Sequence, residues 1–287
     1  MASQTISAAE TPSGKGARDE NFPVGSFLIS RRLRPHVVSY YAFARAIDDI
    51  ADNEELSSEE KLKRLGGFEA AIEGHETDPA YAKAHDIAGR LEMLGITKRH
   101  CLDLVSAFKQ DTLKGRYRDW PELMDYCDRS AAPVGRFLLD LHGESKVAYK
   151  YSDALCKALQ VINHLQDCRE DYLNLDRVYL PNDWMAEEGA ADCELSAPAS
   201  SPGLLAVIRR CVIQTAVLMD TARQLPRLLG DPRLATESEI IVRIALKLCH
   251  QLATRDPVAE RVRLTRLQYL ACGASGISAI LRTRRRI

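Results

Sequence analysis

The spacing of the apolar residues constrains the fold of this chain more than any other feature. From residue 23 onward they recur every three or four positions, as in Leu33, Val37, Tyr41, Ala44 and Ile47. This period places apolar side chains on one face of an α-helix, whereas the alternating β-branched runs typical of strands are scarce. The 287 residues, 46% of them hydrophobic, suffice for a sizeable core. We therefore predict an all-α fold.

Glycine, proline and polar stretches separate the predicted helices. The helices cover residues 33–53, 58–73, 79–93, 98–115, 120–142, 147–173, 203–229 and 237–253. The polar segment between Leu180 and Gly203 is predicted to be a loop, because helical patterning resumes directly after it. We expect a mobile tail over residues 1–20, which are small and polar, and one domain over residues 21–287.

Charge and cysteine content exclude several function classes. Lys and Arg number 39 against 40 Asp and Glu, so no overall positive field attracts nucleic acid. The eight cysteines occur singly, without a C-x-x-C pair, which is typical of reduced thiols in a cytoplasmic protein. The N-terminus lacks the apolar run of a secretory signal, and no stretch approaches the roughly eighteen apolar residues of a spanning helix.

Two predicted helices each carry acidic side chains along one strip. The first strip consists of Tyr41, Arg45, Asp48 and Asp52, and the second of Gln160, Asn163, Asp167 and Asp171. Their spacings of three and four residues place each set on one helix face. Two such strips facing each other would hold carboxylates that repel unless cations neutralise them. Mg²⁺ takes one or two carboxylates together with phosphate oxygens, so the substrate would carry phosphate.

Two other interpretations of these acids stay open. Acidic residues at this spacing more often form a solvated face, although the neighbouring Ile47 and Ile162 indicate that both helices are largely buried. A network of salt bridges with Arg45, Arg169 and Arg177 would hold the acids without any metal.

Four segments resemble the squalene and phytoene synthases, which are class I head-to-head prenyl synthases. They are YAFARAIDDIAD (41–52), AFKQDTLKGRY (107–117), YCDRSAAPVG (126–135) and NHLQDCREDYLNLDRVYLP (163–181). The resemblance is firm over residues 20–185 and looser beyond them. It implies that residues 21–287 form an isoprenoid synthase domain, a helical bundle around a central cavity.

The resemblance also implies roles for individual residues in a magnesium-dependent reaction of a prenyl diphosphate. The ligands of several Mg²⁺ ions would be Asp48, Asp49, Asp52, Asn163, Asp167 and Asp171. The catalytic set would be Asp48, Asp52, Asp167 and Asp171 with Tyr41. Contacts to the substrate would come from Phe22, Arg45, Tyr126, Gly135, Gln160, Arg177 and Tyr179. Arg45 would either bind diphosphate or fix an aspartate, and Gly135 would either leave room for a chain or reflect helix packing.

Within the family, ENFPVGSFLISRRLRPHV (20–37) and the second acidic segment look most like the bacterial members of the hopanoid pathway. This implies ionisation of presqualene diphosphate, rearrangement, and capture by water to give hydroxysqualene and diphosphate. Many relatives carry a lysine where this chain reads Asp19 to Phe22, and an arginine where it has Gln166. Losing two cationic contacts favours a substrate with one diphosphate. The alternatives are a presqualene diphosphate or phytoene synthase that condenses two prenyl diphosphates, and a non-catalytic assembly factor.

The remaining expectations concern cofactors and partners. No G-x-G-x-x-G follows a strand, so we expect no NAD(P)H and no reduction to squalene in this chain. We expect functional coupling to a presqualene diphosphate synthase and a hydroxysqualene reductase. The C-terminal ISAILRTRRRI places arginines beside apolar residues, which is compatible with a solvated tail or with peripheral contact at the inner face of the membrane.

Overall fold

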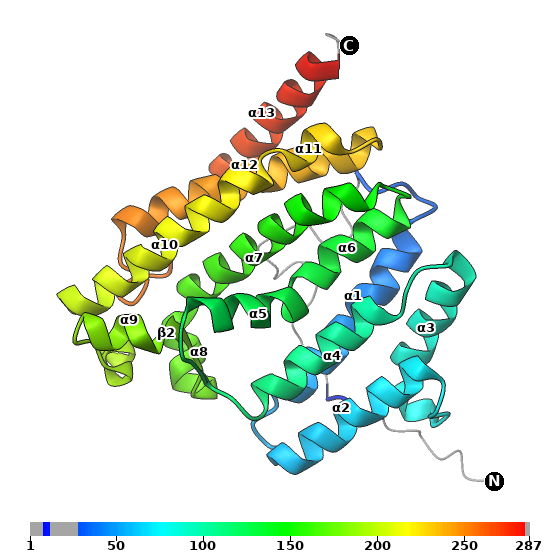
Figure 1. The fold of residues 1–287 in the computed structure, drawn as a ribbon, viewed down its shortest axis with the longest axis horizontal. Coiled ribbons are helices and arrows are strands. Elements are labelled where there is room, and N and C mark those ends of the chain that lie inside the picture. The colour runs from blue at the N-terminus through cyan, green and yellow to red at the C-terminus, as the bar shows by residue number, and fades with distance from the viewer. Residues whose placement is uncertain (1–7, 12–27, 285–287) are drawn as a thin grey trace. The chain divides into compact units, whose positions relative to one another are not determined.

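The computed structural model describes residues 8–11 and 28–284, and these residues form helices joined by short connections and one small sheet (Figure 1). The predicted all-α fold is confirmed. The chain divides into two compact units, residues 1–113 and residues 114–287. Each unit is built around its own buried apolar side chains. The expectation of one isoprenoid synthase domain over residues 21–287 stays a prediction.

The described residues of the first unit form four α-helices and a short 3₁₀ turn. These are α1 (Arg34–Ala51), α2 (Ser58–Glu73), η1 (Pro79–Tyr81), α3 (Ala82–Leu94) and α4 (Arg99–Asp111). Helix α1 packs against α2, α3 and α4. Phe43, Ile47, Phe68 and Leu91 are fully buried between them. Phe43 and Ile47 lie four residues apart on α1, which is the helical period read from the sequence, so this part of the core follows directly from the pattern.

Residues 8–11 pack on the first unit. The backbone N–H of Ala9 donates to the carbonyl of Ala80 across 3.1 Å, and Lys83 pairs with the buried Glu10 at 2.8 Å. The rest of the predicted tail, and Phe22 with it, lies outside the described residues.

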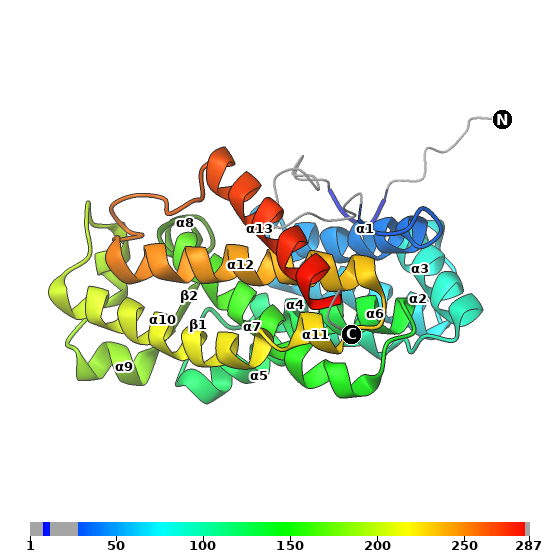
Figure 2. The same ribbon diagram turned by 90° about the horizontal axis from the view of Figure 1, so that it is seen from above.

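The second unit surrounds α7, which contacts α5, α6, α10 and α12 (Figures 1 and 2). Its elements are β1 (Arg116–Tyr117), α5 (Trp120–Ser130), α6 (Ala132–Leu141), η2 (Lys146–Ala148), α7 (Tyr149–Gln166), α8 (Cys168–Leu175), β2 (Val178–Pro181), α9 (Asn182–Glu187), η3 (Asp192–Ser196), α10 (Pro202–Ala222), α11 (Leu225–Leu228), α12 (Pro232–Thr254) and α13 (Arg266–Arg284). Ile162, Val207, Ile208 and Ala245 are fully buried in its core.

Three predicted helices are each divided in the structure, and one of them, 203–229, separates into α10 and α11 after Ala222. The segment 120–142 breaks at Ala131, because Pro133 lacks an N–H group and is suited to the first turn of a new helix. The segment 147–173 breaks at Asp167, where the backbone leaves helical geometry with φ −109° and ψ 11°. The helical spacing of apolar residues continues across these breaks. It therefore predicts the helices correctly but does not show where they divide.

Five elements were absent from the prediction. Helix α9 and the turn η3 lie inside the segment expected to be a loop. The strands β1 and β2 form a short parallel pair. Helix α13 contains Gly273 and Gly276, which lower helix propensity. A Cβ on Gly276 would lie 2.7 Å from Cγ1 of Ile240, so this glycine permits close packing of α13 on α12.

One stretch of the described residues, Pro202–Leu228, has the length and hydropathy of a membrane-crossing helix, with a mean hydropathy of 1.4. The expectation that no stretch approaches the length of a spanning helix is therefore wrong by length and hydropathy. The stretch contains α10, which packs against α7 and α12 through buried residues such as Val207 and Cys211.

Candidate functional site

The first acidic strip lies along α1 at the border between its buried and accessible faces. Tyr41, Arg45, Asp48 and Asp52 are partly exposed, whereas Ile47 is fully buried. The helix ends at Ala51, yet the N–H of Asp52 still donates to the carbonyl of Asp48 across 2.9 Å. Asp48 and Asp52 therefore remain one helical turn apart, as the sequence predicts.

Arg45 organises this strip by pairing with two of its acids. Its guanidinium lies 2.9 Å from Oδ2 of Asp48 and 2.9 Å from Oδ1 of Asp49. Asp49 has only 4% of its side chain exposed, whereas Asp48 has 27%. The structural role considered for Arg45, fixing an aspartate, is therefore present. Asp48 is the more accessible of the two carboxylates.

A lysine closes the C-terminal end of α1. The Nζ of Lys61 donates to the carbonyl of Ala51 across 2.9 Å. A cation at a helix C-terminus is favourable because the last carbonyls lack intrahelical partners. This contact fixes the end of the helix beside Asp52. No pattern in the sequence near Asp52 predicts it.

The second acidic strip continues across the break between α7 and α8. The N–H of Asp167 donates to the carbonyl of Asn163 at 2.9 Å, and the N–H of Asp171 donates to that of Asp167 at 2.8 Å. Gln160, Asn163, Asp167 and Asp171 are all partly exposed, while the interleaved Ile162 is buried. The predicted strip therefore forms, although its helix does not run continuously.

The connection between α12 and α13 holds the second strip in place. Arg261 donates to Oδ1 of Asp167 across 2.7 Å, and Gln166 donates to the carbonyl of Val262 at 2.5 Å. Arg169 donates to the carbonyl of Val258 at 3.5 Å. Burial raises the pKa of Asp167, and the guanidinium of Arg261 opposes that rise. Gln166 thus binds backbone, and the guanidinium of Arg261 reaches the adjacent acid.

An aromatic cluster joins two of the predicted substrate contacts. The rings of Tyr126 and Tyr179 lie 5.7 Å apart, and Tyr117 lies 5.3 Å from Tyr126 and 5.5 Å from Tyr179. His164 stacks on Tyr179 with a centroid distance of 3.6 Å. Burial lowers the pKa of His164 to about 3, so its ring is neutral at neutral pH. The negative faces of such rings suit a nearby cation.

Sequence reasoning missed two members of this cluster. Tyr117 belongs to a recognised segment but carried no role, and His164 lies between two strip residues in the sequence. Among the described residues, Nε2 of His164 has no hydrogen-bond partner although it is buried. Buried polar atoms without a hydrogen-bond partner are rare in folded proteins, and some of them belong to functional sites.

The strand β2 brings the segment after the second strip back toward it. The N–H of Arg177 donates to the carbonyl of Asp171 at 3.1 Å, and Val178 donates to the carbonyl of Gly115 at 2.8 Å. A Cβ on Gly115 would lie 2.6 Å from the carbonyl oxygen of Asp176. The glycine is therefore required for this close approach. Arg177 and Tyr179 are both buried.

Gly135 allows α6 to approach α7 closely. A Cβ there would lie 2.2 Å from Oγ of Ser152 and 2.7 Å from Sγ of Cys156. Helix packing explains this glycine, and its contact with substrate stays a prediction.

The donor atoms of both strips suit Mg²⁺. Within the part of the chain that the structure describes, no three acidic, histidine or cysteine side chains gather at the spacing of a metal site. Mg²⁺ commonly takes only one or two carboxylates and completes its shell with water and phosphate oxygens. Asp48 and Asp167 each hold a guanidinium, at 2.9 and 2.7 Å, so both partly exposed carboxylates already bind a cation.

Comparison with known proteins identifies the family. Residues 16–268 match the family described as squalene/phytoene synthase. The chain belongs to the squalene/phytoene synthase family. Hydroxysqualene synthase from Rhodopseudomonas palustris is 43% identical over 274 residues, which cover 95% of this chain and 93% of that relative. The enzyme of the same name from Sinorhizobium fredii is 42% identical over 261 residues, which cover 91% of this chain and 89% of that relative.

A solved structure supports the same assignment. The crystal structure of a squalene synthase from Alicyclobacillus acidocaldarius matches with a TM-score of 0.68 and 31% identity, covering 80% of this chain and 86% of that one. The resemblance drawn from the four segments is thus confirmed, as is the helical fold of the squalene/phytoene synthase family. The family is typically magnesium-dependent and acts on prenyl diphosphates. The roles of individual strip residues, and the opposition of the two strips, stay predictions.

Proposed function

We propose that this chain is a hydroxysqualene synthase that converts presqualene diphosphate and water into hydroxysqualene and diphosphate. The observation that carries the proposal is the similarity to the Rhodopseudomonas palustris hydroxysqualene synthase, 43% identical over 95% of the chain. Both acidic strips of the family are also retained. In this role the chain is a carbon–oxygen lyase of squalene and hopanoid biosynthesis.

The reaction begins with cleavage of the bond between carbon and the diphosphate oxygen. The electron pair leaves with diphosphate and a carbocation remains, which rearranges. A lone pair of water then forms the new carbon–oxygen bond, and the surplus proton passes to solvent. No reductant enters this balance, because the hydroxyl oxygen replaces the diphosphate oxygen at the same oxidation level.

The acidic residues serve the leaving group in this proposal. Asp48, Asp52, Asn163, Asp167 and Asp171 would hold Mg²⁺, with Asp49 as a further member. The metal would supply Lewis-acid stabilisation of the charge that develops on diphosphate. Arg45 keeps Asp48 and Asp49 in position through its two ion pairs. Gln160 would donate an amide hydrogen to diphosphate.

The aromatic residues serve the cation. Tyr126 and Tyr179, whose ring centroids lie 5.7 Å apart, would form part of an aromatic wall around the cation. Stacking of His164 and Tyr117 fixes these rings and excludes solvent from their edges. Because His164 is neutral, it adds no positive charge that would repel the cation. Tyr41 and Arg177 complete the proposed set.

The proposed setting is the cytoplasm, beside enzymes that make presqualene diphosphate and reduce hydroxysqualene. The decisive experiment feeds the purified chain with Mg²⁺ and either presqualene diphosphate or farnesyl diphosphate, in the absence of reductant. We expect hydroxysqualene from presqualene diphosphate and no product from farnesyl diphosphate. Formation of presqualene diphosphate from farnesyl diphosphate alone would identify a condensing synthase instead.

A further inference from the structure

Helix α13 presents an apolar face to solvent. Leu267, Leu270, Ile277 and Leu281 have exposed fractions of 77%, 69%, 41% and 57%. With the exposed Ala274 they fall within an arc of about 80° and extend for about 21 Å along the helix. We call these five residues the outer face of α13. Contiguous exposed apolar surface of this kind marks an interaction site.

The opposite side of α13 is occupied by α12. Gly276 meets Ile240 at a distance that leaves no room for a side chain, and Ile280 is buried. Figures 1 and 2 both show α13 crossing α12 obliquely, and the two helices are in contact. Helix α13 therefore contacts the rest of the second unit through its opposite side, and the outer face does not take part in that contact.

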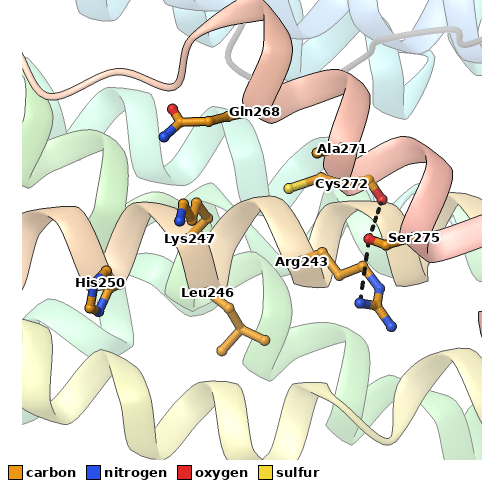
Figure 3. A pocket seen from close by; sticks show the side chains of 8 residues that line it. All are labelled: Arg243, Leu246, Lys247, His250, Gln268, Ala271, Cys272 and Ser275. Carbon is orange, nitrogen blue, oxygen red and sulfur yellow. Dashed lines mark hydrogen bonds between the residues drawn. The ribbon is translucent and has the colours of Figure 1, made fainter.

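A cavity of about 540 Å³ lies between α12 and α13, beside the outer face (Figure 3). It is lined by Arg243, Leu246, Lys247, His250, Gln268, Ala271, Cys272 and Ser275. Arg243 pairs with Glu239 at 2.7 Å and donates to Ser275 at 3.4 Å. Lys247 is exposed and has no acidic partner among the described residues. The hydroxyl of Ser275 donates to the carbonyl of Cys272 at 3.1 Å, so the group that the cavity offers to an anion is the ammonium of Lys247.

The segment that contains α13 carries charge of a single sign, and the acid nearest the cavity, Glu239 on α12, is paired with Arg243. Residues 261–287 contain seven arginines and no acidic residue, while the whole chain has a net charge of −1. Of the arginines, Arg266 and Arg282 lie at the two ends of the outer face and are exposed. This distribution separates the α13 region electrostatically from the rest of the chain.

We propose that the outer face of α13 and the adjacent cavity dock on the surface of an anionic phospholipid bilayer. The leucine and isoleucine side chains would enter the acyl boundary, while Lys247 receives a phosphate headgroup and the end arginines contact further headgroups. Burial of apolar area and attraction to anionic lipid add in such binding. This inference goes beyond the proposed reaction, and the docking does not depend on which prenyl diphosphate the chain converts.

The charge pattern favours a bilayer over a second copy of the chain. Two copies joined through the same face would bring their arginine-rich segments together, because a two-fold contact places equivalent residues near each other. Like charges would repel there, whereas an anionic membrane attracts them.

The test measures sedimentation of the full chain with vesicles of phosphatidylcholine, with or without phosphatidylglycerol, in the absence of substrate. We expect wild-type binding to be at least about tenfold stronger with phosphatidylglycerol, and to weaken at high salt. Leu270→Glu and Ile277→Glu should each lower it about tenfold or more, and Lys247→Gln about fivefold. Ile213→Glu on α10, a residue 63% exposed in the same unit, is the matched control and should bind as wild type.

Circular dichroism confirms folding of each variant, and turnover in detergent micelles reports the chemistry separately. Wild-type binding by both Leu270→Glu and Ile277→Glu would overturn the proposal. Equal losses with Ile213→Glu, or equal binding to both vesicle types, would overturn it as well. Light scattering tests whether a second copy of the chain binds the outer face instead. A wild-type dimer that Leu270→Glu converts to monomers, without loss of vesicle binding, would show that this face mediates self-association and would overturn the proposal.

Discussion

Arg261 donates a 2.7 Å hydrogen bond to Asp167 although 94 positions separate the two residues. The pair connects the segment before α13 to the first acid after α7. Since burial of Asp167 raises the pKa of its carboxyl group, the guanidinium favours the ionised form that a metal or a hydrogen-bond donor requires.

We predict that Arg261→Gln raises the pKa of Asp167 further, because the guanidinium that opposes the effect of burial is lost. Carboxyl ¹³C chemical shifts followed against pH measure the change. Arg263→Gln is the control and should give a smaller rise, since Arg263 contributes less to the potential at this carboxyl. An unchanged titration of Asp167 in Arg261→Gln would contradict the prediction.

The metal roles lead to a prediction for the strips. Asp48→Asn and Asp171→Asn should each reduce turnover of presqualene diphosphate by at least about tenfold at saturating Mg²⁺, because an amide binds the ion more weakly than a carboxylate. Asp125→Asn provides a control, since that exposed acid pairs with Arg129 on α5 and lies outside both strips. Unchanged turnover in either strip variant would remove that residue from the proposed metal site.

His164 should make the stability of the chain depend on pH. Its pKa falls from an ordinary 6.5 to about 3 in the folded chain because of burial, so the unfolded chain binds the proton more readily. The stability that this neutral ring contributes is fully present above pH 6.5 and is lost as pH falls toward 3. The slope between these limits approaches about 1.4 kcal/mol per pH unit.

His164→Phe preserves an aromatic ring against Tyr179 and removes the titrating group. Urea denaturation between pH 7.5 and 5 should therefore show a shallower fall in the free energy of unfolding for His164→Phe than for wild type. Parallel curves for the two proteins would show that His164 is not held neutral by burial.

Gly135 provides a prediction about packing. Gly135→Ala should lower the free energy of unfolding by about 1–3 kcal/mol, since the added methyl overlaps Ser152 and Cys156. Gly89→Ala in α3, where a Cβ meets nothing within 4 Å, should instead be neutral or stabilising by up to about 1 kcal/mol. Thermal melts distinguish the two, and a second change, Ser152→Ala, should recover part of the Gly135→Ala loss.

Local patterning predicted most of the fold. The range predicted for α2 agrees with the structure, and α1 differs only at its ends, because apolar spacing and caps such as Ser57 act within one or two turns. The strands β1 and β2 were missed because they pair over a long distance in the sequence, as the contact between Arg116 and Asp176, 60 positions apart, illustrates. Helix α13 was missed because its glycines serve a contact with α12 that only the folded chain reveals.

The acidic strips were predictable for the same local reason, since a helix converts spacing into a shared face. The partners of the strips were not. Arg261 and Lys61 reach Asp167 and the end of α1 from other elements, and no pattern near the acids indicates them. Nor did the spacing show that Arg45 pairs with Asp49 as well as Asp48.

The three contacts from residues 258–262 to the α7–α8 junction bear on how the chain could be shortened. A fragment ending after α12 would retain every acid of the motif, yet it would lack the backbone oxygens and the guanidinium that steady the junction. A search for a minimal catalytic fragment should therefore keep the chain through at least Val262, even though the recognisable motifs finish some eighty residues earlier.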